Sequence, residues 1–291
     1  MKEQRVAIWL MIAQGVLFAA ETAAIHQIGA GASVMQLALI RSAGGVLLAV
    51  GLAWNVTGGV LRTPQLPLQL LRGGVTLLYL WVLIYSFAAM PFADATAISF
   101  TQTGYIAVFS RLILGETVDG ARWGAAVIAL LGALLIAKPA FAAWNSAYLV
   151  ALAGTSLNGL AFVLNRYLQR QDSQATTMFY SNVVPLLGNF SFIFLIGLPD
   201  SPTLVWLPAI FLFGPLGMLA GIMAVRRANA ATLGPYTLLQ LVIAVLGSGL
   251  IFHELPNMYS VAGTLLIIMS CILSAAAPSI TGGPVGRRSP S

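Results

Sequence analysis

The sequence contains very little charge. Of its 291 residues, 14 are Lys or Arg and 8 are Asp or Glu, so 8% are charged, whereas soluble domains carry about 25%. Apolar residues make up 59% of the chain. A compact globule of this size cannot hide that much apolar surface from water. The composition therefore excludes the soluble protein classes and predicts an all-α integral membrane protein.

Cysteine and histidine are equally scarce. The single cysteine, Cys271, excludes a disulfide framework and a multi-thiolate zinc site. The two histidines, His26 and His253, are too few for a histidine-rich metal centre. The sequence also lacks the H-E-x-x-H, G-x-S-x-G and G-x-x-x-x-G-K-[ST] motifs of membrane proteases and ATP-driven pumps. We therefore expect no metal, no cofactor and no enzymatic activity.

Apolar runs broken by Gly, Pro, Asn or charged residues predict ten transmembrane helices, because a span takes about 20 residues. The remaining tail, residues 279–291, has no apolar periodicity and is predicted to be disordered. The ten runs are Val6–Ile28, Val34–Val56, Leu68–Ala89, Ala93–Leu114, Ala121–Ala137, Ala147–Leu168, Ala175–Leu198, Leu204–Val225, Ala231–Phe252 and Pro256–Ala276.

The basic residues predict how these helices are oriented. With the N-terminus in the cytoplasm, twelve of the 14 Lys and Arg lie at cytoplasmic ends, Lys138 lies outside, and Arg41 falls within the second span. Such an excess follows the positive-inside rule. It predicts that both termini are cytoplasmic, and it explains the net charge of +6 without a nucleic-acid partner.

The sequence also contains an internal repeat. A shift of 138 residues places Ala93–Ala137 over Ala231–Ala275 and superimposes Gln102 on Gln240. A weaker match sets Phe18 of the first span against Phe162 of the sixth.

The repeat predicts two domains, residues 1–138 and residues 139–278, with five helices each. Because five is odd, the two halves must cross the membrane in opposite senses. Inverted repeats of this kind are typical of secondary transporters, which bind their substrate near mid-membrane between the halves.

Two inverted five-helix repeats, with a Glu after the fourth helix (Leu114-Gly115-Glu116) and after the ninth (Phe252-His253-Glu254), resemble the EamA-type transporters of the drug/metabolite transporter superfamily. The resemblance covers the chain up to about Ala277 and is greatest to the bacterial exporters of aromatic amino acids. It implies export of small metabolites across the bacterial inner membrane by alternating access. It further implies a central cavity lined mainly by helices one, three, four, six, eight and nine.

Other readings stay open at this point. The substrate could be another amino acid, a metabolite or a drug, and a passive channel is the alternative from a different class. The sequence does not determine whether protons drive transport. It also leaves the oligomeric state open, and a monomer is compatible with it.

Polar side chains at mid-span are candidates for substrate binding, because a polar group in hydrocarbon is costly unless it is paired or faces a cavity. Gln102, Gln240 and Asn158 offer both donors and acceptors, which suits a zwitterionic amino acid. The alternative is hydrogen bonding between helices. The neighbouring residues with the same predicted role are Ser99, Tyr105, Phe162 and Tyr236.

Three aromatic residues lie near the middle of the third span, namely Tyr79, Trp81 and Tyr85. Tyr and Trp normally concentrate at the membrane interfaces, so this position is unusual. Their rings could stack with the side chain of an aromatic substrate. Ordinary helix packing is the alternative.

Two charged residues lie inside the membrane, Glu21 in the first span and Arg41 in the second, at similar depth. An isolated charge there is costly, which predicts a direct ion pair. A second hypothesis makes Glu21 a carboxylate that couples transport to protons.

Breaks in the helices predict hinges. Pro removes a backbone hydrogen bond, and Gly at G-x-x-x-G spacing allows close helix approach. In a static bundle, the same residues would only fix helix curvature. The predicted hinge residues are Pro185, Pro215, Gly217, Gly221 and Pro235.

Overall fold

The computed structural model describes residues 2–53, 61–115, 120–142, 146–168, 171–191, 200–225, 227, 239–253 and 257–276. Within these ranges the chain is helical and contains no strand. Two short 3-10 helices, η1 (Gly29–Gly31) and η2 (Ser201–Val205), precede α2 and α9. The α-helices are α1 (Lys2–Ile28), α2 (Val34–Ala53), α3 (Leu66–Ala89), α4 (Phe92–Ser99), α5 (Gln102–Leu114), α6 (Gly120–Ala142), α7 (Ala147–Leu168), α8 (Gln174–Phe190), α9 (Leu207–Val225), α11 (Leu239–Leu250) and α12 (Met258–Ala276).

Six helical stretches are long and apolar enough to cross a membrane, and they lie over α1, α2, α3, α4 with α5, α7, and η2 with α9. Helices α6 and α12 carry shorter apolar stretches, Trp123–Ile136 and Met258–Ser270. Large apolar side chains such as Trp9, Leu112 and Leu265 are exposed on the outside of the bundle, as lipid contact requires. The chain is therefore a multi-pass membrane protein, and the number of ten spans stays a prediction.

Local sequence explains several helix ends. The Ser33 hydroxyl accepts the backbone N–H of Gln36 (3.2 Å), and the Ser173 hydroxyl accepts that of Thr176 (3.0 Å). Both serines thus satisfy N–H groups that the first turns of α2 and α8 leave unpaired. Helix α3 ends just before Pro91, because a residue preceding proline avoids the helical conformation.

The predicted fourth span is broken, contrary to the continuous helix expected over Ala93–Leu114. Helix α4 ends at Ser99 and α5 begins at Gln102. The Ser99 hydroxyl donates to the Thr96 carbonyl (2.6 Å), and the Thr101 hydroxyl donates to the Ile98 carbonyl (2.7 Å). At the break, the backbone N–H groups of Phe100 and Thr101 donate to the Ala97 and Ile98 carbonyls, three residues earlier rather than four, which tightens the chain into a turn.

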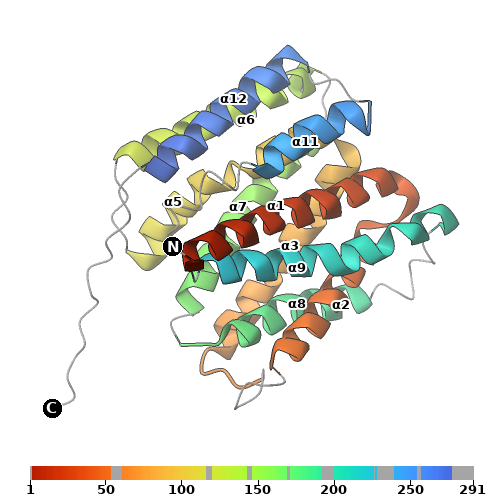
Figure 1. Ribbon diagram of the computed structural model, residues 1–291, viewed down its shortest axis with the longest axis vertical. Coiled ribbons are helices and arrows are strands. Elements are labelled where there is room, and N and C mark those ends of the chain that lie inside the picture. Colours follow the sequence, from red (N-terminus) through yellow and green to blue (C-terminus); the bar gives the residue numbers. More distant parts are fainter. Residues whose placement is uncertain are drawn as a thin grey trace.

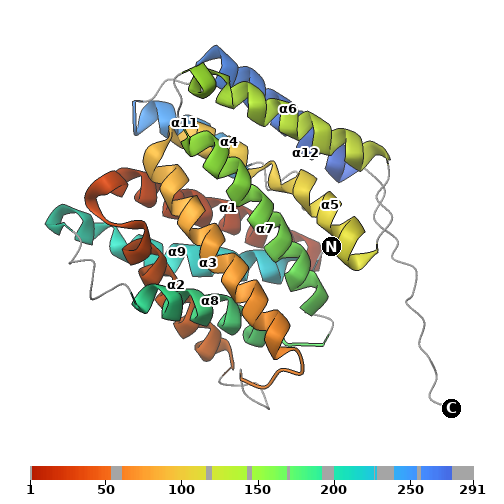
Figure 2. The same ribbon diagram turned by 180° about the vertical axis from the view of Figure 1, so that it is seen from behind.

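The helix contacts repeat between the two halves of the chain. Helix α1 packs on α9 as α7 packs on α3, and α1 packs on α11 as α7 packs on α5. Likewise, α2 packs on α9 as α8 packs on α3 (Figures 1 and 2). In each comparison, a helix of one repeat is replaced by the equivalent helix of the other, and the contact is kept. This is the pattern expected of two structural repeats.

Helices α6 and α12 lie side by side at one end of the molecule (Figure 1). The Ser270 hydroxyl donates to the Ala125 carbonyl (2.6 Å). A Cβ added to Gly132 would lie 2.8 Å from the Gly263 carbonyl oxygen. The repeat relates these two contacts to each other. A shift of 138 residues takes Ala125 to Gly263, and the reverse shift takes Ser270 to Gly132. Because Ala125 meets Ser270 while Gly132 meets Gly263, the two helices run antiparallel.

The close α6–α12 crossing gives a stability prediction. Gly132→Val should destabilise the folded protein by about 1–3 kcal/mol, because the added methyl groups overlap the Gly263 backbone. Gly124→Val is the matched control on the same helix, since a Cβ at Gly124 meets nothing within 4 Å. Thermal unfolding of the two purified variants measures the difference. Equal melting temperatures would contradict the close crossing.

Candidate substrate-binding cavity

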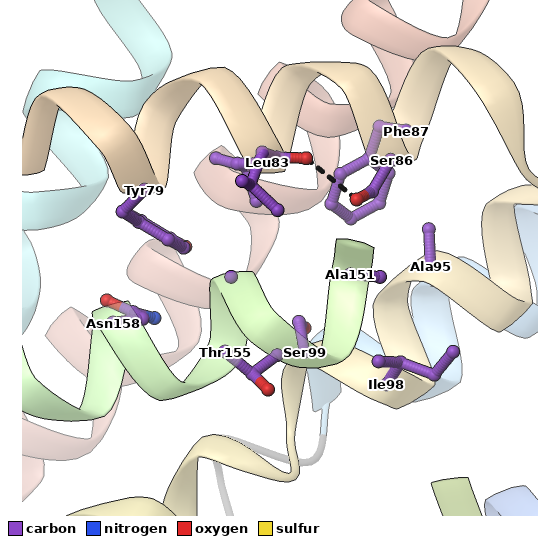
Figure 3. Close-up of a pocket in the computed structure, with 12 residues that line it drawn as sticks. Tyr79, Leu83, Ser86, Phe87, Ala95, Ile98, Ser99, Ala151, Thr155 and Asn158 are labelled. Carbon is purple, nitrogen blue, oxygen red and sulfur yellow. Dashed lines mark hydrogen bonds between the residues drawn. The ribbon is translucent and has the colours of Figure 1, made fainter. Parts of the chain in front are cut away.

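A small cavity lies where α3, α4 and α7 meet (Figure 3). Its volume is about 20 Å³, which is room for roughly one water molecule. Helices α3 and α4 belong to the first repeat and α7 to the second, so the cavity lies between the two. The lining residues are Tyr79, Val82, Leu83, Ser86, Phe87, Ala95, Ile98, Ser99, Ala151, Gly154, Thr155 and Asn158.

Aromatic rings cover one side of this cavity. Phe87, which lines it, packs on Phe92 with ring centroids 5.8 Å apart, and Phe92 packs on Phe252 at 5.3 Å. His26 lies 4.6 Å from the Phe252 ring, and its Nδ1 is 2.7 Å from the Phe87 carbonyl oxygen. Binding pockets for small molecules measure about 300–1,000 Å³. In the conformation described here, the cavity is therefore much smaller than a pocket that holds a small molecule.

A pair of side-chain amides joins the two repeats beside the cavity. The Asn158 amide nitrogen on α7 donates to the Gln102 side-chain oxygen at the start of α5. One turn earlier on α7, the hydroxyl oxygens of Thr155 and Thr101 are 3.1 Å apart. The break between α4 and α5 is thus held against α7 by polar contacts. Among the predicted site residues, Asn158 and Gln102 are in direct contact.

Tyr79, Ser99 and Asn158 were predicted from sequence and all line the cavity. Figure 3 shows Tyr79 on α3 opposite Asn158 on α7, with Ser99 further along the same cavity. Tyr105 packs nearby on α7, because a Cβ at Gly159 would lie 2.8 Å from the Tyr105 Cβ. The cavity thus combines one phenol ring with several neutral donors and acceptors.

Three other predicted aromatic residues lie away from the cavity. The Trp81 indole N–H donates to the Asn189 side-chain oxygen on α8 (2.8 Å). Tyr85 is 39% exposed and Phe162 is 51% exposed, so both lie on the outside of the bundle. The expected aromatic group on α3 is therefore divided, because residues six positions apart on a helix point about 120° apart. The roles of these three residues stay predictions.

Gln240 lies near the start of α11, half-buried beside α1. A Cβ at Gly15 on α1 would lie 3.6 Å from the Gln240 backbone nitrogen. Gln14 precedes Gly15 as Asn158 precedes Gly159, so the weaker repeat match makes Gln14 the counterpart of Asn158. The sequence contained that signal, but Gln14 was not predicted as a site residue. Tyr236 and Pro235 lie outside the described residues.

Glu21 and Arg41 form an ion pair between α1 and α2. Arg41 Nε donates to Glu21 Oε1 at 2.5 Å, and the two side chains are 10% and 1% exposed, respectively. The Glu21 carboxylate also fills the space beside Gly214 on α9, where a Cβ would overlap it. The pair is therefore enclosed by three helices. Its role in transport stays a prediction.

Glycines let α9 approach α1 closely. A Cβ at Gly217 would lie 2.9 Å from the Phe18 ring, and a Cβ at Gly221 would overlap the Gln14 amide. Pro215 lies inside α9 and Pro185 inside α8. These positions are consistent with curvature fixed by packing and equally with hinges, so the hinge assignments remain predictions.

A model of the EamA-like transporter family matches residues 5–138 and again residues 145–276. The chain is 25% identical to the pseudopaline exporter of Pseudomonas aeruginosa strain UCBPP-PA14, over 91% of this chain and 94% of the relative. It is 28% identical to the riboflavin transporter of Vibrio cholerae, over 91% and 90%.

A third relative and a solved structure are also similar to this chain. The S-adenosylmethionine uptake transporter of Rickettsia bellii is 24% identical over 72% of each chain. A solved crystal structure with 20% sequence identity superimposes with a TM-score of 0.66, covering 93% of this chain and 97% of that chain. The latter supports the fold alone.

Proposed function

The chain belongs to the EamA-like transporter family of membrane transporters, and from this premise we propose that it exports aromatic amino acids across the bacterial cytoplasmic membrane by alternating access. The observation that carries the proposal is the cavity between α3, α4 and α7, where Tyr79 faces Asn158, whose side-chain amide donates to Gln102 beside the cavity. A phenol ring can stack with an aromatic side chain. The amides can accept from the ammonium group and donate to the carboxylate of the same substrate.

The packing of the helices supports alternating access. Ten spans in two inverted repeats would make α6 and α12 antiparallel, and the contacts of Gly132 with Gly263 and of Ser270 with Ala125 agree with that. The cavity is built from both repeats and is too small for a substrate in this conformation. Rocking one repeat against the other would open it first to one side of the membrane and then to the other. The distribution of basic residues supports cytoplasmic termini.

The names of the relatives favour a second candidate substrate class. They are named as transporters of pseudopaline, S-adenosylmethionine and riboflavin, and none is named for an aromatic amino acid. A metabolite of that kind is therefore the alternative cargo for the same site. A passive channel is the alternative mechanism.

Counterflow in proteoliposomes tests the proposal. The purified protein is preloaded with unlabelled tryptophan, phenylalanine, threonine, S-adenosylmethionine, riboflavin or buffer, and uptake of labelled tryptophan is followed. Acceleration by the aromatic amino acids alone supports the proposal. Uptake that is indifferent to every preload would indicate a channel. Tryptophan uptake too slow to measure, with S-adenosylmethionine or riboflavin exchanged instead, would replace the proposed cargo.

The two tyrosines of α3 provide a matched pair of variants. Tyr79→Ala should lower tryptophan counterflow about tenfold, because Tyr79 lines the cavity and an aromatic contact contributes about 0.5–1.5 kcal/mol beyond its buried area. Tyr85→Ala removes the same ring from the exposed side of α3 and should leave counterflow within twofold. The initial rates of the two variants, at equal protein content, give the comparison. A larger loss for Tyr85→Ala would place the substrate elsewhere.

A further inference from the structure

Arg72, in the second turn of α3, is a buried cation. Its exposed fraction is 5%. Its Nη1 donates to the Thr177 carbonyl (3.3 Å) and to the Ser181 hydroxyl, both on α8. Both acceptors are neutral, and the ion pairs found within the described ranges do not include Arg72.

The hydrogen-bonding capacity of this guanidinium is only partly used. Arginine carries five N–H donors, and Arg72 Nε has no hydrogen-bond partner in the part of the chain that the structure describes. The side-chain oxygen of Gln69, one turn earlier on α3, is likewise buried without a partner. The Asp172 carboxylate, also on this side of α3, instead accepts from Gln69 Nε2 (2.7 Å) and from the Thr63 hydroxyl (2.7 Å). A buried charge with a spare donor and no counter-ion among the described residues is suited to an anionic ligand.

Arg72 lies on the side of α3 that faces the cavity. Tyr79 and Ser86, which line the cavity, follow Arg72 at spacings of seven residues, which returns a helix to nearly the same face. Seven residues correspond to about 10 Å along the helix axis. With the proposed orientation, Arg72 lies on the cytoplasmic side of the cavity. The guanidinium is thus placed about two helical turns from Tyr79, toward the side from which a solute would enter.

The present partners of Arg72 are in the other repeat, since α3 belongs to the first repeat and α8 to the second. A carboxylate would be a stronger partner than the Ser181 hydroxyl and the Thr177 carbonyl, because charge-assisted and bidentate bonds to arginine are roughly twice as strong as neutral ones. A carboxylate arriving here would displace these contacts across the repeats. Its binding would therefore favour separation of α3 from α8.

We propose that Arg72 binds the substrate carboxylate on the cytoplasmic side of the cavity, before the substrate reaches the amides, and thereby selects amino acids over analogues that lack the carboxylate. This inference rests on the proposed function. It assigns to Arg72 a specificity role that is separate from the Tyr79 and Asn158 contacts.

Binding of two ligands that differ only in the carboxylate tests the assignment. Tryptophan and tryptophanamide are titrated against the purified protein and its variants Arg72→Gln, Arg72→Lys and Arg62→Gln. The last removes an exposed arginine from the segment just before α3 and is the matched control. We expect Arg72→Gln to weaken tryptophan binding about tenfold to hundredfold, the range expected for losing a hydrogen bond to a charged group. Tryptophanamide binding should stay within twofold, Arg72→Lys should fall between, and Arg62→Gln should match the wild type.

The other outcomes separate this proposal from the preceding one. Equal weakening of both ligands in Arg72→Gln would overturn the carboxylate role and leave Arg72 a packing residue. Unchanged tryptophan binding would overturn it as well. If the wild-type protein binds neither ligand, the aromatic amino acid function itself fails and the Arg72 assignment falls with it. Because Arg72→Lys keeps the positive charge, it reports on the carboxylate even if Arg72→Gln does not fold.

Discussion

Arg41→Met should lower the free energy of unfolding by about 3–5 kcal/mol, because it leaves the Glu21 carboxylate buried without its partner. Glu21 is 1% exposed and packed between α1, α2 and α9, so water cannot take the place of the guanidinium. Unfolding in mixed micelles with increasing denaturing detergent measures the loss. Arg227→Met is the control, since its contact with Glu3 at 3.5 Å lies on the surface, where an ion pair contributes about 0–1 kcal/mol.

The double variant Glu21→Leu with Arg41→Met separates structural pairing from proton coupling. Replacing both members of a buried ion pair with apolar residues is often neutral or stabilising, so most of the stability lost in Arg41→Met should return. If the pair only holds α1 against α2, tryptophan counterflow should also return to at least half of the wild-type rate. A double variant that folds normally but no longer responds to an imposed pH gradient, where the wild type does, would instead identify Glu21 as a coupling carboxylate.

Long-period features of the sequence predicted the architecture well. Apolar runs and the scarcity of charge predicted an all-helical membrane protein, and the structure and the family match agree with both. The 138-residue shift also relates the two residue pairs that meet where α6 crosses α12, although the contact itself was not predicted. These signals depend on many residues at once, so single exceptions do not remove them.

Short-range competition was harder to predict. At Ser99–Thr101 the backbone bonds change from four-residue to three-residue spacing, although Ser156 in the unbroken α7 makes the same hydroxyl bond as Ser99, so the residue types alone do not indicate the break. It is this break that brings Gln102 to the start of a helix beside Asn158. A hydropathy average cannot distinguish a continuous span from two half-spans, because it is taken over many more residues than the few at which the helix breaks.

The direction of individual side chains was predictable only in part. Tyr79 faces the cavity and Tyr85 faces outward, as their six-residue spacing on a helix allows, but nothing in the sequence indicates which of the two points inward. That choice depends on the contact of α3 with α7 and α8, for example on Gly154, which leaves room for Val82. The periodicity of a single helix contains no information on which other helix packs against it.

Asn158→Ala and Gln102→Ala should each lower tryptophan counterflow about tenfold to hundredfold, because each removes one of the two amides at the cavity and leaves the other without its partner. The effect should appear as weaker tryptophan binding. Ser156→Ala is the control on the same helix, since the Ser156 hydroxyl bonds to the Ala153 carbonyl of its own helix. Initial counterflow rates and tryptophan dissociation constants are the measurements.

The double variant Gln102→Ala with Asn158→Ala decides whether the pair binds substrate or only joins the helices. If each amide contacts a different group of the substrate, the losses in tryptophan affinity should be roughly additive. If the amides serve only each other, the second substitution should add little, because the interaction is already lost. In that case the variants would melt at lower temperature while tryptophan affinity stayed near the wild-type value, and the substrate site would have to be sought away from the α5–α7 contact.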